Sequence, residues 1–344
     1  CNVMRWEMRP RLFLRTSEFL WQEGHTAHAT REEAMEETLK MLEVYRGFME
    51  EILALPVIPG EKSEGERFPG ADNTYTCEAM MSDRKALQAG TSHFLGQNFA
   101  RAFEIRFQNR AGELEHAWTT SWGTSTRMIG AVIMAHSDND GLILPPRLAP
   151  VKAVILPIST DEEKLQEVIL PKAREIAATL NRVLGPMAVR VDTDFHLRPA
   201  DRFFRHLQKG VPLRLELGER EMEAGKVRAV RRDTAERSDI AWETVPTEVP
   251  KLLETVQQAL FDRALAFREA NTRHASSFEE MKTLLENEGG FVTAFFAGDR
   301  SDEKAIKEAT GATVRCFPLS DERRGTCFFT GKENAKLAIF ARAY

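Results

Sequence analysis

The sequence predicts a mixed α/β (α+β) protein, in which a strand-rich first region with one strong helix is followed by two smaller regions that mix strands and helices. Residues 1–150 combine short strand patterns, glycine and tryptophan with one strong helix. Residues 151–250 alternate strands and helices, as small α/β domains do. Residues 251–344 open with a long helix and continue as a mixed segment. A length of 344 residues fits two or three domains.

The strong helix of the first region begins after Thr30. Glu33 follows Thr30 at the spacing of a capping box, in which each side chain bonds the other residue's backbone N–H. Pro56 ends the pattern. Apolar residues recur with a helical period at Met35, Leu39, Leu42, Tyr45, Phe48, Met49 and Ile52.

The second region reads as a mostly parallel sheet with covering helices. Residues 151–158 form a continuous apolar run that is typical of a buried strand. An amphipathic helix over 165–184 follows, and further strands are expected at 187–191, 211–217 and 226–232. A long helix is expected from Pro250 to about Arg273, and residues 58–70 read as an exposed loop.

Composition excludes several classes of protein. The net charge of −5 and the pI near 6.0 argue against a generic polyanion binder, although one basic patch would suffice for tRNA. No stretch approaches the run of about 20 apolar residues that spans a bilayer, so no membrane partner is expected. The four scattered cysteines (Cys1, Cys77, Cys316 and Cys327) indicate reduced thiols and a cytoplasmic protein. The opening residues have the pattern of a strand interior, so we expect native residues to precede Cys1.

The first polar cluster is a predicted hairpin. Arg5 and Glu7 stand two residues apart, so they share one face of a strand. A turn containing Pro10 leads to Arg15 on the next strand. An arginine fork matches a phosphate, and a glutamate accepts from an exocyclic amine. A cross-strand salt bridge is the alternative interpretation.

The strand after this turn carries an unusual face. Period-2 alternation places Phe19, Trp21, Glu23 and His25 side by side. Burying a carboxylate and an imidazole beside aromatic rings is costly unless they are paired or meet a ligand. The face suits a small, cationic and partly apolar ligand, and a Glu–His pair satisfied within the core is the alternative.

Two further clusters are weaker. Thr91 and His93 share a strand face after Gln88, and Gly90 permits close backbone approach. A polar strand end is the alternative. Arg147 follows two prolines on a stiff backbone, as an anion-binding or base-stacking arginine should, and a plain surface arginine is the alternative.

Taken together, these segments resemble the prolyl-tRNA synthetases, which are class II enzymes. The hairpin with Arg5, Glu7 and Arg15 is similar to motif 2, and residues 19–27 (FLWQEGHTA) are similar to a stretch specific to that family. Residues 90–99 (GTSHFLGQNF), 122–127 (WGTSTR) and 209–218 (KGVPLRLELG) match further family stretches, and 141–150 (GLILPPRLAP) resembles motif 3. The resemblance extends to the terminal Tyr344.

The resemblance implies a class II antiparallel β-sheet core with helices, followed by an α/β anticodon-binding domain and a small C-terminal α/β domain. It also implies that the chain activates L-proline with ATP and Mg²⁺ and loads it onto tRNA(Pro). It implies catalytic roles for Arg5 and Arg147, and the weak Mg²⁺ site would lie near Gln88. The ATP-binding residues would be Arg5, Glu7, Arg15, Thr16, Gln88, Thr91 and Arg147. The proline pocket would comprise Arg5, Phe19, Trp21, Glu23, His25, Phe68 and His93. A homodimer is expected as well.

Departures from the family refine this expectation. About 120 residues separate the two motifs, so the large editing insertion of bacterial-type enzymes is absent and the archaeal/eukaryotic-like form is expected. The family's four-cysteine zinc site retains only Cys327 in residues 251–344, so no structural zinc is expected. The family's Thr-x-Glu loop and motif 1 would lie before Cys1.

The tRNA is expected to bind residues 151–250, the anticodon-binding domain. The candidate basic surface comprises Arg214, Arg228, Arg231, Arg232 and Arg237. Pairing of Arg231 and Arg232 with Asp233 or Glu216 is the alternative. A non-catalytic tRNA-binding paralogue and a class II synthetase for another amino acid stay open as alternative functions.

Overall fold

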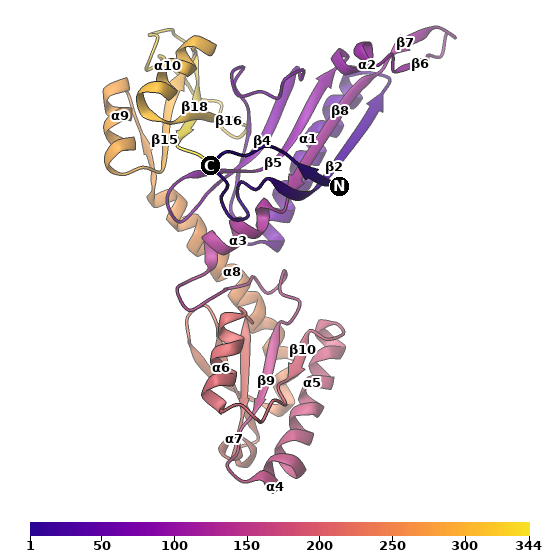
Figure 1. Ribbon diagram of the computed structural model, residues 1–344, viewed down its shortest axis with the longest axis vertical. Coiled ribbons are helices and arrows are strands. Elements are labelled where there is room, and N and C mark those ends of the chain that lie inside the picture. Colours follow the sequence, from indigo (N-terminus) through magenta and orange to yellow (C-terminus); the bar gives the residue numbers. More distant parts are fainter. The chain divides into compact units, whose positions relative to one another are not determined.

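The computed structural model describes all 344 residues, and the chain folds as two compact units (Figure 1). The first unit comprises Cys1–Glu50, Leu55–Ala135 and Leu265–Tyr344, and the second comprises Glu51–Ala54 and His136–Ala264. None of the helices is both long and apolar enough to cross a lipid bilayer.

The first unit is built on one 11-stranded sheet. All neighbours along it are antiparallel except β14 and β15. Its order is β1 (Asn2–Met4), β2 (Glu18–His28), β8 (Trp118–Ser125), β5 (Ala86–Gly96), β4 (Asn73–Met80), β3 (Ile58–Glu61), β16 (Thr313–Pro318), β18 (Ala335–Ala341), β15 (Phe291–Phe296) and β14 (Thr272–His274), and β17 (Arg324–Gly325) pairs with β18. A separate hairpin joins β6 (Arg106–Gln108) and β7 (Leu114–His116).

Helix α1 (Arg31–Gly47) packs against β4, β5 and β8. The predicted capping box is present, because Thr30 accepts from the Glu33 N–H while the Glu33 carboxylate accepts from the Thr30 N–H. A π-helical turn (Phe48–Ile52) continues it towards Pro56. The prediction of the apolar face was wrong at Leu39 and Phe48, which are exposed. The buried residues are Ala34, Thr38, Leu42, Tyr45 and Met49.

Two further expectations for the first unit were wrong. The first strand ends at Met4, so Arg5 and Glu7 follow it rather than sharing its face. Residues 58–70 are not simply an exposed loop, because they begin with β3, which pairs with β4 and β16. A Cβ on Gly60 would stand 2.5 Å from the Cys316 sulfur, so only glycine permits this close strand approach.

The remaining helices of the first unit are short. They are α2 (Asn98–Ala102), α3 (Arg127–His136), α9 (Phe278–Asn287) and α10 (Arg300–Thr310). Helices α9 and α10 belong to the C-terminal part of the chain, where a core with buried Phe296, Met281 and Phe340 packs on β15, β16 and β18. All four cysteines are free thiols.

The second unit contains a five-stranded sheet in the order β10 (Val189–Val191), β9 (Ala153–Pro157), β11 (Leu213–Leu217), β12 (Lys226–Arg231) and β13 (Arg237–Ala241). The expectation of a mostly parallel sheet was wrong for half of its pairings. Strands β10, β9 and β11 are parallel, whereas β11, β12 and β13 are antiparallel. Only the short helix α7 (Glu219–Glu223) separates β11 from β12, and a parallel return needs a crossover of about a dozen residues or more.

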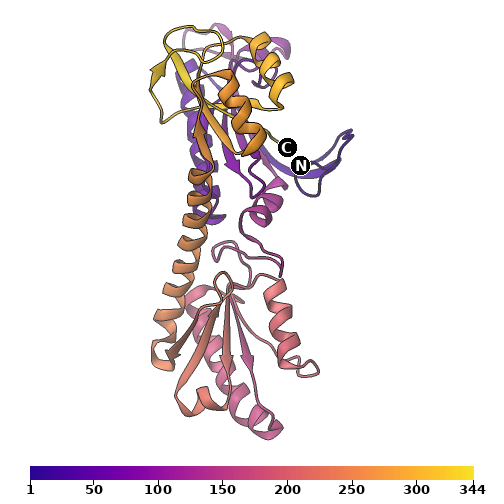
Figure 2. The ribbon, with the colours of Figure 1, turned by 90° about the vertical axis from the view of Figure 1, so that its left-hand side faces the viewer.

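Helices flank this sheet, with α6 (Pro199–Gln208) on one side and α8 (Val245–Ala270) on the other (Figure 2). The predicted helix over 165–184 comprises a π-helical turn (Leu165–Ile169) and α5 (Leu170–Leu184), preceded by α4 (Glu162–Lys164). Ile176 and Leu180 of α5 join Leu253 and Val256 of α8 in the core beneath β9 and β11. Helix α6 was not predicted; it starts with Pro199 at a first-turn position that proline favours.

Candidate active site

Three antiparallel strands of the first unit align polar side chains in rows across one face of the sheet. Glu23 of β2 lies opposite Gly123 of β8, which in turn lies opposite Thr91 of β5. The next row joins His25, Ser121 and His93 in the same way. Because residues two apart share a face, the predicted face of β2 and the predicted cluster of β5 come together.

A cavity of about 240 Å³ opens on these rows. It brings together eight of the residues that the sequence predicted for proline or ATP, namely Phe19, Trp21, Glu23, His25, Phe68, Gln88, Thr91 and His93. Ser121, Trp122, Ser125 and Arg127 also line it, and the sequence analysis gave these four residues no role.

One end of the cavity is mainly aromatic. The rings of Phe68 and His93 have centroids 4.7 Å apart, and the Thr74 hydroxyl lies 3.1 Å from His93 Nδ1. Burial lowers the pKa of His93 to about 4, so its imidazole is neutral at pH 7. The buried Trp21 Nε1 has no hydrogen-bond partner within the protein, which leaves a donor free for a ligand.

The one carboxylate in this part of the cavity belongs to Glu23. Its Oε2 lies 3.4 Å from His25 Nε2, so the Glu–His pair considered from the sequence does exist. Both side chains remain partly exposed, however, with exposed fractions of 28% and 64%. Because the pair is partly exposed to solvent, the Glu23 carboxylate oxygens remain available to a cationic ligand.

Arg5, Glu7 and Arg15 gather beside this cavity. The Glu7 carboxylate lies 3.4 Å from the Arg5 guanidinium and 3.6 Å from that of Arg15. Arg5 also stacks over the ring of Phe19, at 5.1 Å from its centroid. The salt bridge considered from the sequence is therefore present, yet both arginines are about one-third exposed and can reach an anion.

Arg127 is the functional candidate that the sequence analysis missed. It starts α3 and lines the cavity, where its guanidinium donates to the carbonyl oxygens of Leu14 at 3.0 Å and Gln88 at 3.2 Å. Burial, together with the nearby charges of Arg15 and Arg5, lowers its pKa to about 10. Three cations with few acidic partners repel one another, and an anion would relieve that repulsion. The signal was present in residues 122–127, of which Arg127 is the last.

Arg147 belongs to the second unit, where its guanidinium lies 2.8 Å from the Glu254 carboxylate of α8 and 3.4 Å from the Glu51 carbonyl oxygen. Its backbone N–H donates to the Gln257 side chain at 3.1 Å. The stiff segment around Arg147 therefore has partners within its own unit.

In the second unit, most of the predicted basic surface is already paired. Arg231 donates twice to Asp233, and Arg232 donates twice to Asp138. The alternative interpretation therefore applies to Arg231. Arg214 pairs with Glu216, and Arg228 pairs with Asp239. Arg237 is exposed and has no acidic partner, and it lines a cavity of about 280 Å³ with Arg214, Arg231 and Arg232.

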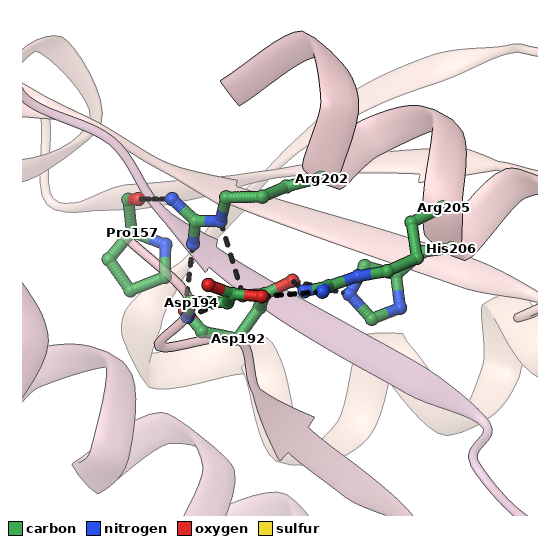
Figure 3. A network of polar contacts seen from close by, with 6 residues as sticks. All are labelled: Pro157, Asp192, Asp194, Arg202, Arg205 and His206. Carbon is green, nitrogen blue, oxygen red and sulfur yellow. Dashed lines mark hydrogen bonds and ion pairs between the residues drawn. The ribbon is translucent and has the colours of Figure 1, made fainter. Parts of the chain in front are cut away.

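A buried ionic network fixes α6 to the end of β10 (Figure 3). Asp192 directly follows β10 and accepts from Arg202, Arg205 and His206 at 2.6–3.2 Å. Burial would raise the pKa of Asp192, but these donors and the Asp194 N–H outweigh it and lower the pKa to about 2. Arg202 also donates to the Pro157 carbonyl oxygen at 3.1 Å. Helix α6 thus has one defined position beside the cavity that His206 lines.

Cys327 is the only cysteine in its neighbourhood. Its sulfur accepts N–H groups from Ala297 at 3.3 Å and Thr330 at 3.4 Å. Burial would raise the pKa of this thiol, but hydrogen bonds from the Thr330 side chain and from the backbone N–H groups of Thr330, Ala297 and Phe329 outweigh it and lower the pKa. Across the chain, no group of three or more His, Cys, Asp or Glu side chains is arranged to hold a metal ion.

An antiparallel sheet that carries arginines beside a ligand-sized cavity, with an α/β domain after it, agrees with a class II aminoacyl-tRNA synthetase core, and the family models show that class. Residues 1–136 match the family model "tRNA synthetase class II core domain (G, H, P, S and T)". Residues 152–252 match "Anticodon binding domain", and residues 278–344 match "Prolyl-tRNA synthetase, C-terminal".

Individual relatives and a solved structure point to one family within this class. The proline–tRNA ligase of Flavobacterium johnsoniae is 50% identical over 344 residues, covering 100% of this chain and 69% of the relative. That of Chlorobaculum tepidum is 51% identical over 352 residues, covering 100% and 72%. A crystal structure of prolyl-tRNA synthetase from Cryptosporidium parvum, complexed with halofuginone and AMPPNP, superposes with a TM-score of 0.94 at 37% identity, covering 100% of this chain and 71% of that one. The chain belongs to the prolyl-tRNA synthetase family.

Proposed function

We propose that this chain is a proline–tRNA ligase, which activates L-proline with ATP and transfers it to tRNA(Pro). The observation that carries this proposal is the single cavity in which an aromatic cage, one carboxylate and Arg127 meet. A proline carboxylate oxygen attacks the α-phosphorus of ATP, the bond to the leaving diphosphate breaks, and prolyl-adenylate forms. A terminal ribose hydroxyl of the tRNA then attacks the prolyl carbonyl carbon, and AMP leaves.

The aromatic end of the cavity suits the proline ring. Trp21, Phe68 and His93 supply apolar faces, and Glu23 supplies a carboxylate for the secondary ammonium. The low pKa of His93 matters here, because a neutral imidazole does not repel the ligand's positive charge. The unpartnered Trp21 Nε1 can donate to an oxygen of the ligand.

The arginine-rich end suits the nucleotide. Arg5, Arg15 and Arg127 would hold phosphate oxygens and stabilise the charge that develops during in-line attack. Gln88 and Thr91 line the same cavity, and Glu7 and Thr16 lie in the segment between β1 and β2. We assign the arginine role of motif 3 to Arg127 rather than to Arg147, because Arg127 reaches the cavity and Arg147 is paired with Glu254.

Magnesium would accompany ATP. The Gln88 side-chain carbonyl is the one amide oxygen available in the cavity, and no acidic cluster stands beside it. The phosphates and water would therefore supply most of the ligands, as Mg²⁺ usually requires in nucleotide sites. The ion would neutralise phosphate charge during adenylate formation.

Three finer points also belong to the proposal. We infer the compact form without an editing insertion, because β3, β4, β5 and β8 follow β2 within one sheet and only the small β6–β7 hairpin lies outside it. We expect a homodimer in the cytoplasm, which size-exclusion chromatography and fractionation would test. The free thiols suit that compartment.

Proline-dependent ATP–pyrophosphate exchange tests the assignment. Arg127→Ala should lower the exchange kcat by about 100- to 1000-fold, the usual loss for one preorganised donor to developing charge. Arg147→Ala is the matched control and should stay near the wild-type rate. Equal losses in the two variants would contradict the assignment of Arg127, and exchange driven by threonine rather than proline would contradict the proposed substrate.

A further inference from the structure

A second, larger cavity adjoins the candidate active site in the first unit. Its volume is about 530 Å³, and it is lined mainly by aromatic and aliphatic side chains, including Leu95, Phe99, Phe103 and Ile105. It shares His25, Phe68 and Ser121 with the first cavity. We refer to this second cavity as the apolar annex.

The strand register explains why the two cavities are neighbours. Beyond the row that joins His25 and Ser121, the next row on the same face pairs Ala27 with Thr119. Ala27 and Thr119 both line the apolar annex. The face therefore changes along the strands from charged, at Glu23, to apolar, at Ala27.

Phe68 stands between the two cavities. Its ring centroid lies 4.7 Å from that of His93 on the active-site side and 6.4 Å from that of Phe99 on the annex side. The Phe68 N–H donates to the Thr74 hydroxyl at 3.0 Å, which anchors its backbone. Gly70 follows at φ +91°, where a Cβ would stand 2.8 Å from the Phe99 ring. This backbone conformation keeps the segment against Phe99.

We propose that Phe68 is a specificity-determining residue that closes the amino-acid site off from the apolar annex. The inference rests on the proposed function. A cyclic amino acid whose ammonium meets Glu23 places its ring at the His25–His93 row and its far edge towards Phe68. A substituent on that edge meets the Phe68 ring in the wild-type protein. With a shorter side chain at position 68, an apolar substituent enters the annex and buries its surface there.

The test compares proline with the cis and trans diastereomers of 4-phenylproline in ATP–pyrophosphate exchange. In Phe68→Ala and Phe68→Leu we expect kcat/KM for 4-phenylproline to rise at least about ten-fold over wild type, because even one methylene in an apolar pocket changes specificity by about that factor. The kcat/KM for proline should fall in the same variants, since the site loses part of the aromatic cage around the proline ring. Ile105→Ala is the matched control: it enlarges the annex but keeps the Phe68–Phe99 ring contact, so kcat/KM should stay near the wild-type value for both proline and 4-phenylproline.

The outcomes distinguish a failure of the annex proposal from a failure of the proposed function. If the wild-type protein exchanges with proline but neither Phe68 variant gains 4-phenylproline, the annex proposal is wrong and the proposed function stands. A gain in Ile105→Ala equal to that in Phe68→Ala also overturns it, because Phe68 would then not be the barrier. If the wild-type protein does not exchange with proline at all, the proposed function itself fails.

Discussion

A buried ionic triad lies where the C-terminal part of the chain meets β4. The Glu78 carboxylate accepts from Lys62 Nζ at 2.8 Å and from the Arg315 guanidinium at 2.9 Å and 3.0 Å. All three side chains are almost inaccessible, with exposed fractions of 0% for Glu78, 1% for Lys62 and 7% for Arg315. Burial would raise the pKa of Glu78, but the two cations outweigh it and hold the pKa below its usual range.

The arrangement predicts unequal effects of removing its members. Glu78→Gln leaves two buried cations without a counter-charge and should cost about 3–5 kcal/mol of unfolding free energy. Lys62→Met leaves the Glu78 carboxylate paired with Arg315. The loss of unfolding free energy should therefore be about 1–3 kcal/mol, the usual cost of one unsatisfied buried group. For a folding unit of about 150–250 residues, 1 kcal/mol shifts Tm by about 2–4 °C. We therefore expect Glu78→Gln to lower Tm by about 10 °C.

Thermal unfolding followed by calorimetry at pH 7 measures both variants. The stabilisation from a carboxylate of depressed pKa is present above its unfolded pKa and is lost as pH falls through the folded value. The gap between wild type and Glu78→Gln should therefore close in acid. A Tm loss in Glu78→Gln no larger than that in Lys62→Met would refute the view that two cations share one carboxylate.

Three other perturbations follow from the structure. Gly24→Ala should destabilise the first unit by about 1–3 kcal/mol, because its Cβ would stand 2.3 Å from the Trp122 indole; an unchanged Tm would contradict this. Asp192→Asn leaves Arg202 buried without its carboxylate and should lower Tm at pH 7. That difference should shrink as pH falls from about 4 to 2, through the folded pKa of Asp192; a constant difference would argue against the network. Arg237→Ala should raise KM for tRNA and weaken its salt dependence while pyrophosphate exchange stays unchanged; equal loss of both activities would indicate a structural role.

Gly60 and Cys327 are two positions whose role a local sequence pattern leaves undecided. From the sequence, Gly60 belongs to a predicted exposed loop. Only the approach of Cys316 from a distant strand shows why a side chain cannot fit there. Cys327 alone cannot hold Zn²⁺, which needs four ligands. The expectation of a chain without structural zinc stays a prediction, which metal analysis of the purified protein would test.

The sequence by itself determined those features that depend on neighbouring residues. Alternation placed Trp21, Glu23 and His25 on one strand face, and the spacing of Thr30 and Glu33 specified a helix start, because backbone geometry repeats locally. The motif stretches also indicated the family, since many residues in order are needed for that match.

The tertiary structure alone decided which distant residues meet. It brought Arg127 to the cavity, and it paired Arg147 with Glu254 and Arg232 with Asp138. It also made β3 an interior strand between β4 and β16. Such pairings depend on which strands become neighbours in a sheet, and no local pattern carries that information because the partners are separated by tens to hundreds of residues. Whether a charged side chain lies on the surface, in a binding site or in the core is therefore known only once its neighbours in the folded chain are known.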